Sequence, residues 1–230
     1  REFERMTTTV LSAGVKAAVV DYVEKLVARK PEQSRLHFFH SASGMCSPDL
    51  LLEQPLAIAV SGPAAGVSAT CELANDLNIS HAVTFDMGGT TAKICLIEHG
   101  QPLKSRVFEV DRQARFLKGS GLPVRIPVIE MIEIGAGGGS IAWVDDGGML
   151  RVGPQSAGAD PGPACYGKGG TQFTVTDANL VLGRLDGESF MGGAMPLDRE
   201  AARKAAEPIA AKLDLSIDQV AAGVIDVANS

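Results

Sequence analysis

One stretch of the chain decides the fold, and it reads His81-Ala82-Val83-Thr84-Phe85-Asp86-Met87-Gly88-Gly89-Thr90-Thr91-Ala92-Lys93. The apolar residues before Asp86 predict a strand from His81 to Phe85. The β-branched and apolar residues that follow predict a second strand from Thr91 to Ile97. A Walker loop or a dinucleotide-binding loop would open a helix instead. The glycines here therefore predict a hairpin turn, and the stretch indicates an α/β fold.

The residue types in this hairpin suit phosphate binding. Gly88 and Gly89 allow a tight turn that brings bare N–H groups against oxyanions, and the hydroxyls of Thr90 and Thr91 add donors. Asp86 ends the first strand and is a candidate ligand for Mg²⁺ through water, because hard cations prefer oxygen. Judged by residue types alone, a plain hairpin without a ligand explains the stretch equally well, since Asp and Gly also dominate ordinary turns.

Two glycine-rich segments follow. Residues 135–170 hold 12 of the 26 glycines and also Pro154, Pro161 and Pro163, which predicts loops and short hairpins. The segment 134–140 fails as a dinucleotide fingerprint, because Ser140 replaces the third glycine and a strand follows. Its glycines form either a flexible linker or a loop facing a phosphate. The stiffer segment 156–167 suits an active-site wall, with Asp160 as either a helix cap or a ligand for a metal or substrate N–H.

Periodicity and capping patterns predict the remaining elements. The expected helices span 8–29, 64–77, 176–185 and 198–213, and a last one is opened by Ser216 and Gln219 as a capping box. The expected strands span 36–40, 56–60, 102–110 and 124–134, with a hairpin at 143–150. Gly62 and Gly66 form a GxxxG pair, which favours close helix packing over a helix N-terminus that faces an anion.

Composition excludes several classes of protein. The 230 residues carry a net charge of −6, which argues against binding nucleic acid or anionic membranes. The longest uncharged window, 54–71, is interrupted by Pro55, Gly62 and Pro63, so we expect no membrane span and, by elimination, a cytoplasmic protein. The four cysteines are far apart, which favours free buried thiols. His81 and His99 look isolated and structural.

Taken together and in order, six segments resemble the hydantoinase A/oxoprolinase family, including its N-methylhydantoinase A-like subunits. They are residues 4–9, 60–67, 84–91, 134–142, 152–163 and 174–183. The resemblance implies an α/β ATPase domain of the actin/hexokinase/Hsp70 (ribonuclease H-like) type, with a mixed sheet and flanking helices. It also implies ATP-dependent hydrolysis of a small cyclic amide, of the hydantoin or 5-oxoproline type, through a phosphorylated carbonyl intermediate. An ATP-dependent ketone carboxylase subunit and a non-catalytic packing domain are the alternatives.

The resemblance also implies site residues and cofactors. ATP with Mg²⁺ or Mn²⁺ would bind beside Asp86, which positions the metal or the attacking water. The γ- and β-phosphates would be held by Gly88, Gly89, Thr90 and Thr91, and the same cleft would be lined by Gly137, Gly138 and Gly139. Many relatives carry an acid where this chain has Lys93, which we expect to contact a phosphate instead.

The organisation that the resemblance implies is a central fragment of a longer subunit. It would comprise a helix-rich lead-in (1–80), a part with the hairpin and glycine-rich loops (81–185) and a helical end (186–230). We expect the fragment to be inactive alone. Its partners would be the missing N- and C-terminal parts of its own subunit and a hydantoinase B-type subunit.

Overall fold

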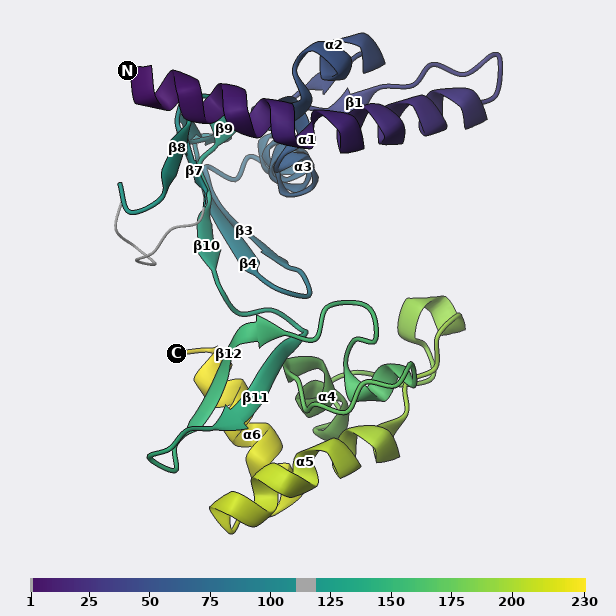
Figure 1. Ribbon diagram of the computed structural model, residues 1–230, viewed down its shortest axis with the longest axis vertical. Coiled ribbons are helices and arrows are strands. Elements are labelled where there is room, and N and C mark those ends of the chain that lie inside the picture. Colours follow the sequence, from purple (N-terminus) through teal and green to yellow (C-terminus); the bar gives the residue numbers. More distant parts are fainter. Residues whose placement is uncertain (1, 111–118) are drawn as a thin grey trace. The chain divides into compact units, whose positions relative to one another are not determined.

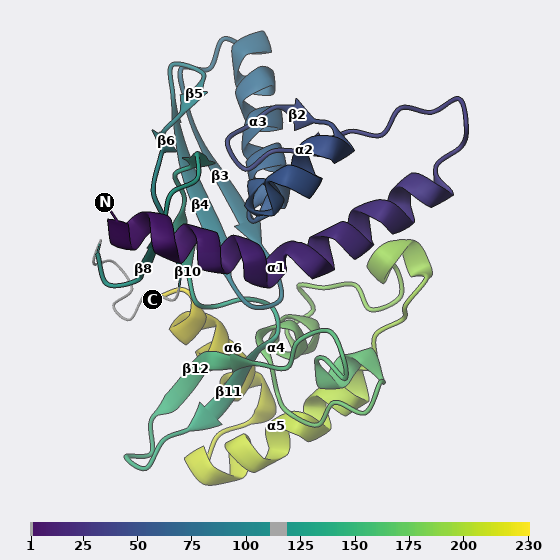
Figure 2. The same ribbon diagram turned by 45° about the horizontal axis from the view of Figure 1, so that its top comes forward.

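The computed structural model describes residues 2–110 and 119–230, and their contacts divide them into two units (Figures 1 and 2). The first unit holds the described residues up to Asp86 and those from Lys93 to Glu133. The second holds residues 87–92 and 134–230. The turn of the sequence-predicted hairpin therefore packs with the second unit, while most of its two strands belongs to the first. The three-part organisation expected from the sequence stays a prediction.

A long helix opens the first unit. Helix α1 spans Glu2–Arg29, so it starts six residues before the expected position 8. Threonines are accommodated in its first turns, where the hydroxyls of Thr8 and Thr9 donate to the carbonyls of Glu4 and Arg5. Helix α2 (Pro48–Glu53) follows the two-residue strands β1 (Phe38–Phe39) and β2 (Met45–Cys46). Val23, Cys46, Leu51 and Ala57 form the core beneath them.

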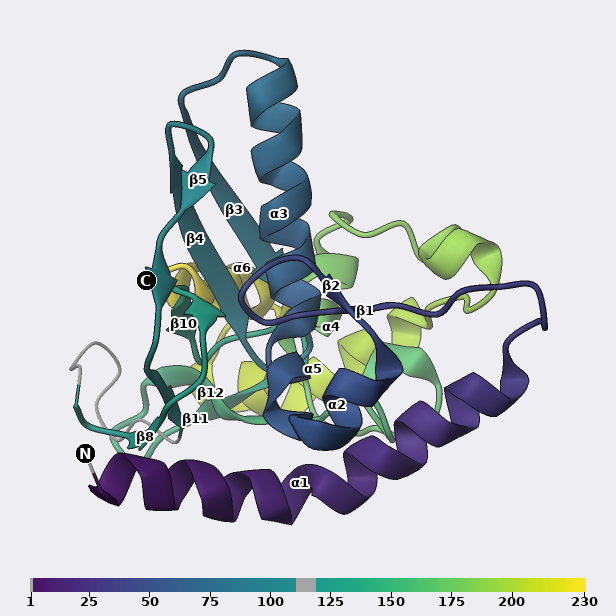
Figure 3. The same ribbon diagram turned by 90° about the horizontal axis from the view of Figure 1, so that it is seen from above.

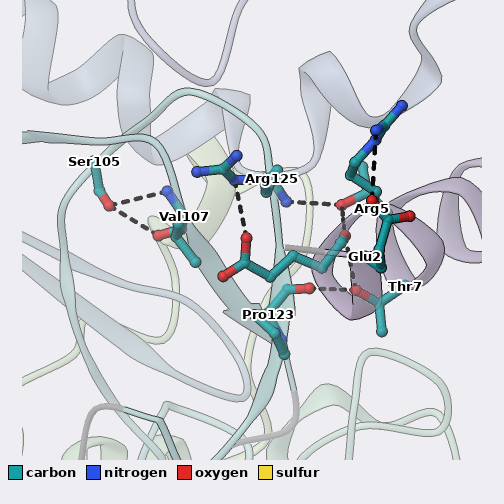
Figure 4. A network of polar contacts seen from close by, with 9 residues as sticks. Glu2, Arg5, Thr7, Ser105, Val107, Pro123 and Arg125 are labelled. Atoms are coloured by element: carbon teal, nitrogen blue, oxygen red, sulfur yellow. Dashed lines mark hydrogen bonds and ion pairs between the residues drawn. The ribbon is translucent and has the colours of Figure 1, made fainter.

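Polar contacts attach the start of α1 to strand β8 (Leu122–Val124) (Figure 4). The Thr7 hydroxyl donates to the Pro123 carbonyl, and the Arg125 N–H donates to the Thr8 hydroxyl over 2.8 Å. The Arg125 guanidinium lies 3.2 Å from the Glu4 carboxylate. The first of the family-like segments thus fastens a helix to a strand more than a hundred residues away.

The main sheet of the first unit has the strand order β10-β4-β3, with β5 paired to β4. These strands are β3 (His81–Met87), β4 (Ala92–Glu98), β5 (Gln101–Pro102) and β10 (Ile132–Ile134). Both predicted hairpin strands are confirmed. Helix α3 (Ser61–Asp76) runs alongside them (Figure 3) and buries Val67 and Cys71 with Cys95 and Ile97 of β4.

Three expectations for the first unit were wrong. Residues 56–60 are not a strand, because Pro55 begins a 3₁₀ helix (Pro55–Ile58) and α3 follows from Ser61. The regions 102–110 and 124–134 break into short strands: β6 (Lys104–Ser105), β7 (Phe108–Val110), β8, β9 (Val128–Ile129) and β10. Pro127 lies in the break between β8 and β9, where it cannot donate to a strand ladder. Pro102 and Pro123 lie within the short strands β5 and β8. Gly62 and Gly66 are exposed, and a Cβ on either would meet no described atom within 4 Å, so they make no close packing contact.

A hairpin and three helices build the second unit. Strands β11 (Ser140–Val144) and β12 (Leu150–Ser156) pair antiparallel, as expected for a hairpin in this region. Helices α4 (Val175–Val181), α5 (Arg199–Leu213) and α6 (Ile217–Ala228) pack around a core that includes Phe173, Leu180, Val220 and Val224. The Ala142 N–H donates to the Phe173 carbonyl, which joins the hairpin to the segment before α4.

Most of the predicted caps are present. Asp198 accepts from the Ala201 N–H at the start of α5, and Ser216 and Gln219 form the capping box of α6. The start and end of α4 were predicted wrongly. The sequence predicts a helix over 176–185, whereas α4 is capped by Thr174, begins at Val175 and ends at Val181. Thr176 already lies within the first turn, and its hydroxyl donates to the Gly138 carbonyl.

All four cysteines are buried free thiols, as predicted. Burial raises the pKa of Cys95 to about 11. Burial, followed by the neighbouring Asp177 carboxylate, raises the pKa of Cys165. Among the described residues, no helix combines the length and the apolar character needed to span a membrane.

Candidate functional site

The hairpin loop, residues 87–92, connects β3 to β4. It is closed by a 2.9 Å hydrogen bond from the Gly88 N–H to the Thr91 carbonyl. Gly88, Gly89 and Thr90 are exposed, whereas Thr91 is half-buried. The strand that follows confirms that this motif makes a turn between strands, so it differs from loops that open a helix.

The glycine loop, residues 135–140, packs directly behind the hairpin loop. The Gly138 N–H donates to the Gly88 carbonyl over 2.9 Å, and the Gly139 N–H donates to the Gly89 carbonyl over 2.7 Å. No side chain fits between the two loops, because a Cβ on Gly137 would lie 2.7 Å from backbone atoms of residues 88–90. The structure therefore brings together the two motifs that the sequence singled out. The glycine loop is no flexible linker, since its backbone groups are engaged.

These contacts orient the hairpin loop. In a trans peptide the C=O of one residue and the N–H of the next point in opposite directions, and the cis bonds of the described chain lie elsewhere, before Pro154 and Pro161. Because the carbonyls of Gly88 and Gly89 point at the glycine loop, the N–H groups of Gly89 and Thr90 point away from it. Neither N–H has a hydrogen-bond partner among the described residues. Two adjacent donors on an exposed turn are an arrangement that accepts an oxyanion.

A serine and a helix start complete the support of the two loops. Ser156, at the end of β12, donates its hydroxyl to the Gly89 carbonyl over 3.2 Å. Thr176 in the first turn of α4 donates both its N–H and its hydroxyl to the Gly138 carbonyl, each over 2.8 Å. The site drawn from the sequence contained neither residue. The start of α4 could be recognised as a capping pattern, but its contact with residue 138 could not.

Asp177 anchors the second glycine- and proline-rich segment. It is fully buried, and its carboxylate accepts hydrogen bonds from the N–H groups of Ala164, Cys165 and Thr174 and from the Thr174 hydroxyl. The start of α4 thus holds both glycine-rich segments in place, one through Thr176 and the other through Asp177. This explains how residues 156–167 stay ordered despite their glycine content.

The two charged residues expected at the site belong to the first unit. Asp86 is exposed and directly precedes the hairpin loop. The Lys93 ammonium lies 3.2 Å from the Glu133 carboxylate on the neighbouring strand β10. This ion pair gives Lys93 a protein partner, and its contact with a phosphate stays a prediction.

Other polar residues have structural surroundings. Asp145 holds the β11–β12 turn by accepting from the N–H groups of Gly147 and Met149, and Arg151 lies 2.7 Å away. The Met149 N–H, followed by Arg151, lowers the pKa of Asp145. His81 and His99 are not isolated: their ring centroids lie 5.3 Å apart, because the paired strands β3 and β4 bring the two ends of the hairpin together.

Metal ligands do not cluster in the described part of the chain. No group of three or more His, Cys, Asp or Glu side chains there could hold a metal ion. Asp160 is exposed in the segment between β12 and α4.

Comparison with known proteins identifies the family. The model of the Hydantoinase/oxoprolinase family matches residues 5–230, so the chain belongs to this family. It is 39% identical to caprolactamase subunit alpha of Pseudomonas jessenii over 100% of the chain and 32% of that protein. It is 35% identical to 5-oxoprolinase of Saccharomyces cerevisiae over 98% of the chain and 18% of that protein.

A solved structure has a similar fold. The nucleotide-free structure of acetone carboxylase, an enzyme of ATP-dependent acetone carboxylation, superposes with a TM-score of 0.84 at 27% identity, over 99% of this chain and 31% of that one. The relatives of this chain thus include proteins named as a caprolactamase subunit, a 5-oxoprolinase and an acetone carboxylase, and the fold is mixed α/β. The chain spans about a third or less of the length of these relatives.

Proposed function

We propose that this chain is the part of an ATP-dependent amidohydrolase that holds the phosphate groups of ATP. The observation that carries the proposal is the pair of N–H groups of Gly89 and Thr90, which have no hydrogen-bond partner in the described part of the chain and point away from the glycine loop on an exposed turn. Gly88 and the hydroxyls of Thr90 and Thr91 complete the contacts to the β- and γ-phosphates. The solved structures of an ATP-dependent caprolactamase and of acetone carboxylase support the choice of nucleotide.

The glycine loop has a supporting role in this proposal. The N–H groups of Gly138 and Gly139 are engaged by the hairpin loop, and the Gly137 N–H donates to the Ser140 hydroxyl. Gly137, Gly138 and Gly139 act by allowing two backbones to approach closely, and they leave the N–H groups of the hairpin loop for the nucleotide. Direct contact of these glycines with ATP stays a prediction.

Asp86 has the donor chemistry for Mg²⁺. Its carboxylate is exposed beside the loop, and Mg²⁺ is usually held by one or two carboxylates together with substrate phosphates and water. Bound there, the ion would neutralise charge on the phosphates. In its absence Asp86 can still orient a water molecule by accepting its proton in a hydrogen bond.

The proposed reaction opens a cyclic amide. The amide oxygen of the substrate attacks the γ-phosphorus of ATP, and ADP leaves. Water then adds to the activated carbon, and the ring C–N bond breaks as the nitrogen takes up a proton, which leaves an acyl phosphate. A second water molecule hydrolyses this acyl phosphate to the carboxylate and inorganic phosphate. In these steps the chain holds the leaving phosphates and stabilises the charge that develops on them, which is the main task of a protein in phosphoryl transfer. In this proposal other parts of the enzyme bind the cyclic amide and the rest of the nucleotide.

The proposal extends to architecture and partners. We infer that the chain is a central part of a longer cytoplasmic subunit with an actin/hexokinase-like ATPase fold, completed by further segments of its own subunit and by a hydantoinase B-type subunit. The lengths of the relatives and the subunit name of the caprolactamase relative support this.

Calorimetry and ATP turnover in the full-length protein test the assignment. We expect affinity to fall in the order Mg-ATP, Mg-ADP, AMP, because the loop binds the terminal phosphates. Asp86→Asn should lower turnover about 100-fold, the size typical for losing one electrostatic contact in a transition state. Asp146→Asn removes an exposed carboxylate from the β11–β12 turn and serves as the matched control. Equal affinity for AMP and ATP, or an unaffected Asp86→Asn protein, would reject the proposal.

Carboxylation is the second candidate function, favoured by the close superposition on acetone carboxylase. Bicarbonate dependence separates the two reactions. ATP turnover with a cyclic amide and without bicarbonate supports the hydrolase, whereas turnover that requires bicarbonate and a ketone supports the carboxylase. If neither substrate class nor any loop variant affects nucleotide turnover, a packing role remains.

A further inference from the structure

A chain of hydrogen bonds runs through two peptide groups to the exposed Thr90 N–H. It begins at the Thr176 hydroxyl, which donates to the Gly138 carbonyl over 2.8 Å. The peptide of residues 138–139 continues it, because the Gly139 N–H donates to the Gly89 carbonyl over 2.7 Å. The peptide of residues 89–90 ends it with the Thr90 N–H. All these residues belong to the second unit.

The Ser156 hydroxyl joins the same chain at its last link. It donates to the Gly89 carbonyl over 3.2 Å, so that this carbonyl accepts from both Gly139 and Ser156. A carbonyl oxygen has two lone pairs, and two donors fix the plane of its peptide more firmly than one. The plane of the 89–90 peptide sets the direction of the Thr90 N–H.

Such a chain also strengthens its terminal donor. Hydrogen bonds in series polarise one another, and each peptide that accepts at its carbonyl becomes a better donor at its N–H. A neighbouring chain runs from the Ser140 N–H through the Gly137 carbonyl, the Gly138 N–H and the Gly88 carbonyl to the Gly89 N–H, but it consists of backbone only. Side chains enter only the chain that ends at Thr90, at Thr176 and Ser156.

We propose that Thr176 and Ser156 are positioning residues for the anion-binding N–H of Thr90, and that they act through the peptides 138–139 and 89–90 without touching the nucleotide. This inference rests on the proposed function of the hairpin loop. It adds two side chains, 86 and 66 residues downstream of Thr90, whose hydroxyls set the affinity for phosphate.

The test compares hydroxyl deletions in the full-length protein, with Mg-ATP, inorganic tripolyphosphate and adenosine as probes. Thr176→Val keeps the side-chain shape and the backbone N–H bond to Gly138 but removes the hydroxyl. We expect its Kd for Mg-ATP and for tripolyphosphate to rise about three- to tenfold, the effect of one hydrogen bond. Adenosine affinity should be unchanged. Thr176→Ser should restore the native Kd within about twofold, since one neutral hydrogen bond is then regained.

Controls separate positioning from folding. Thr70→Val removes a hydroxyl that donates to the Gly66 carbonyl over 2.9 Å in the first unit, and it should leave every Kd unchanged. Ser156→Ala should repeat the loss seen with Thr176→Val, and it decides the question if Thr176→Val does not fold. In turnover assays the KM for ATP should rise in both variants while kcat stays unchanged. A smaller fraction of active protein would instead lower kcat.

The possible failures differ from one another. If the native protein binds neither Mg-ATP nor tripolyphosphate, the proposed function itself is wrong, and this inference falls with it. If the native protein binds both and the folded Thr176→Val and Ser156→Ala proteins bind them equally well, the loop function stands and the positioning role is rejected. Equal losses for adenosine and tripolyphosphate also reject it, because they would indicate a general disturbance.

Discussion

Replacing Gly137 by alanine tests the contact on which the site depends. In the structure a Cβ at this position would lie 2.7 Å from the Gly88 carbonyl oxygen and from the carbonyl carbons of Gly89 and Thr90. These are backbone atoms of the hairpin loop, so no flexible side chain can move aside. Ordinary contact begins near 3.4 Å, and the two loops must therefore separate by roughly 0.7 Å.

This separation has a predictable energetic cost. The hydrogen bonds from Gly138 to Gly88 and from Gly139 to Gly89, now 2.9 and 2.7 Å long, would stretch to the limit of hydrogen bonding or beyond it. Overpacking alone typically destabilises by about 1–3 kcal/mol, and each weakened hydrogen bond adds about 1 kcal/mol. We therefore expect the second unit to lose about 3–5 kcal/mol of stability.

Urea unfolding followed by tryptophan fluorescence measures this loss. The chain has one tryptophan, Trp143 on β11, whose indole N–H donates to the Gly153 carbonyl over 2.8 Å. Its fluorescence reports on the unit that contains Gly137. In the full-length protein the same substitution should raise the Kd for Mg-ATP at least tenfold. The displaced loop no longer orients its N–H groups toward the phosphates, and a loss of about 1.4 kcal/mol of binding free energy corresponds to that factor.

A glycine in open space provides the control. Gly66 lies within α3, and a Cβ there would meet no described atom within 4 Å, so Gly66→Ala should stabilise the first unit by about 0.5–1 kcal/mol. The Trp143 transition should stay where it is. If Gly137→Ala unfolds at the native urea concentration and binds Mg-ATP with native affinity, the two loops do not pack as described.

Three further outcomes are expected. Asp177→Asn should destabilise the second unit by about 3 kcal/mol in the same urea assay. The buried carboxylate accepts from four donors, and the NH₂ group of an asparagine would face some of these donors and could not accept from them. Native-like stability would show that those hydrogen bonds contribute little. Asp145→Asn should lower the thermal midpoint at neutral pH. The folded pKa of Asp145 lies below its ordinary value of 3.8, so the difference between the two proteins should persist above pH 3.8 and vanish as the pH falls through the folded pKa; a difference that grows in acid would contradict this sign. The four thiols should resist a disulfide reagent at pH 8 in the folded chain and react after unfolding. They are buried, and the pKa of Cys95 is about 11, so little reactive thiolate is present. Rapid labelling of the folded chain would contradict their burial.

Local interactions made much of the chain predictable. Asp198 at the start of α5, and Ser216 with Gln219 at the start of α6, are caps that act over three residues. The hairpin around Gly88 follows from two short β-forming runs that flank a turn. The hydrogen bonds behind these features join residues close in sequence, so the residue types alone indicate them.

Other predictions failed because residues close in sequence did not indicate what the segment would contact. Residues 56–60 have the composition of a strand, yet the prolines around them favour helical turns. His81 and His99 lie 18 positions apart, and only the pairing of β3 with β4 shows that they meet. The small residues at positions 62 and 66 suggest packing, but nothing in the described chain lies against them.

By itself the sequence determined that a glycine turn with an adjacent acid and two hydroxyls exists, and it indicated the family to which such a turn belongs. Only the tertiary structure decided which backbone groups of that turn remain to bind a ligand. The Gly88 and Gly89 carbonyls are taken by residues 138, 139 and 156, and residue 138 is held in turn by Thr176. The packing of the whole unit determines these distant hydrogen-bond partners. A backbone carbonyl has the same chemistry in every residue, so the residue types cannot indicate which distant donor it will meet.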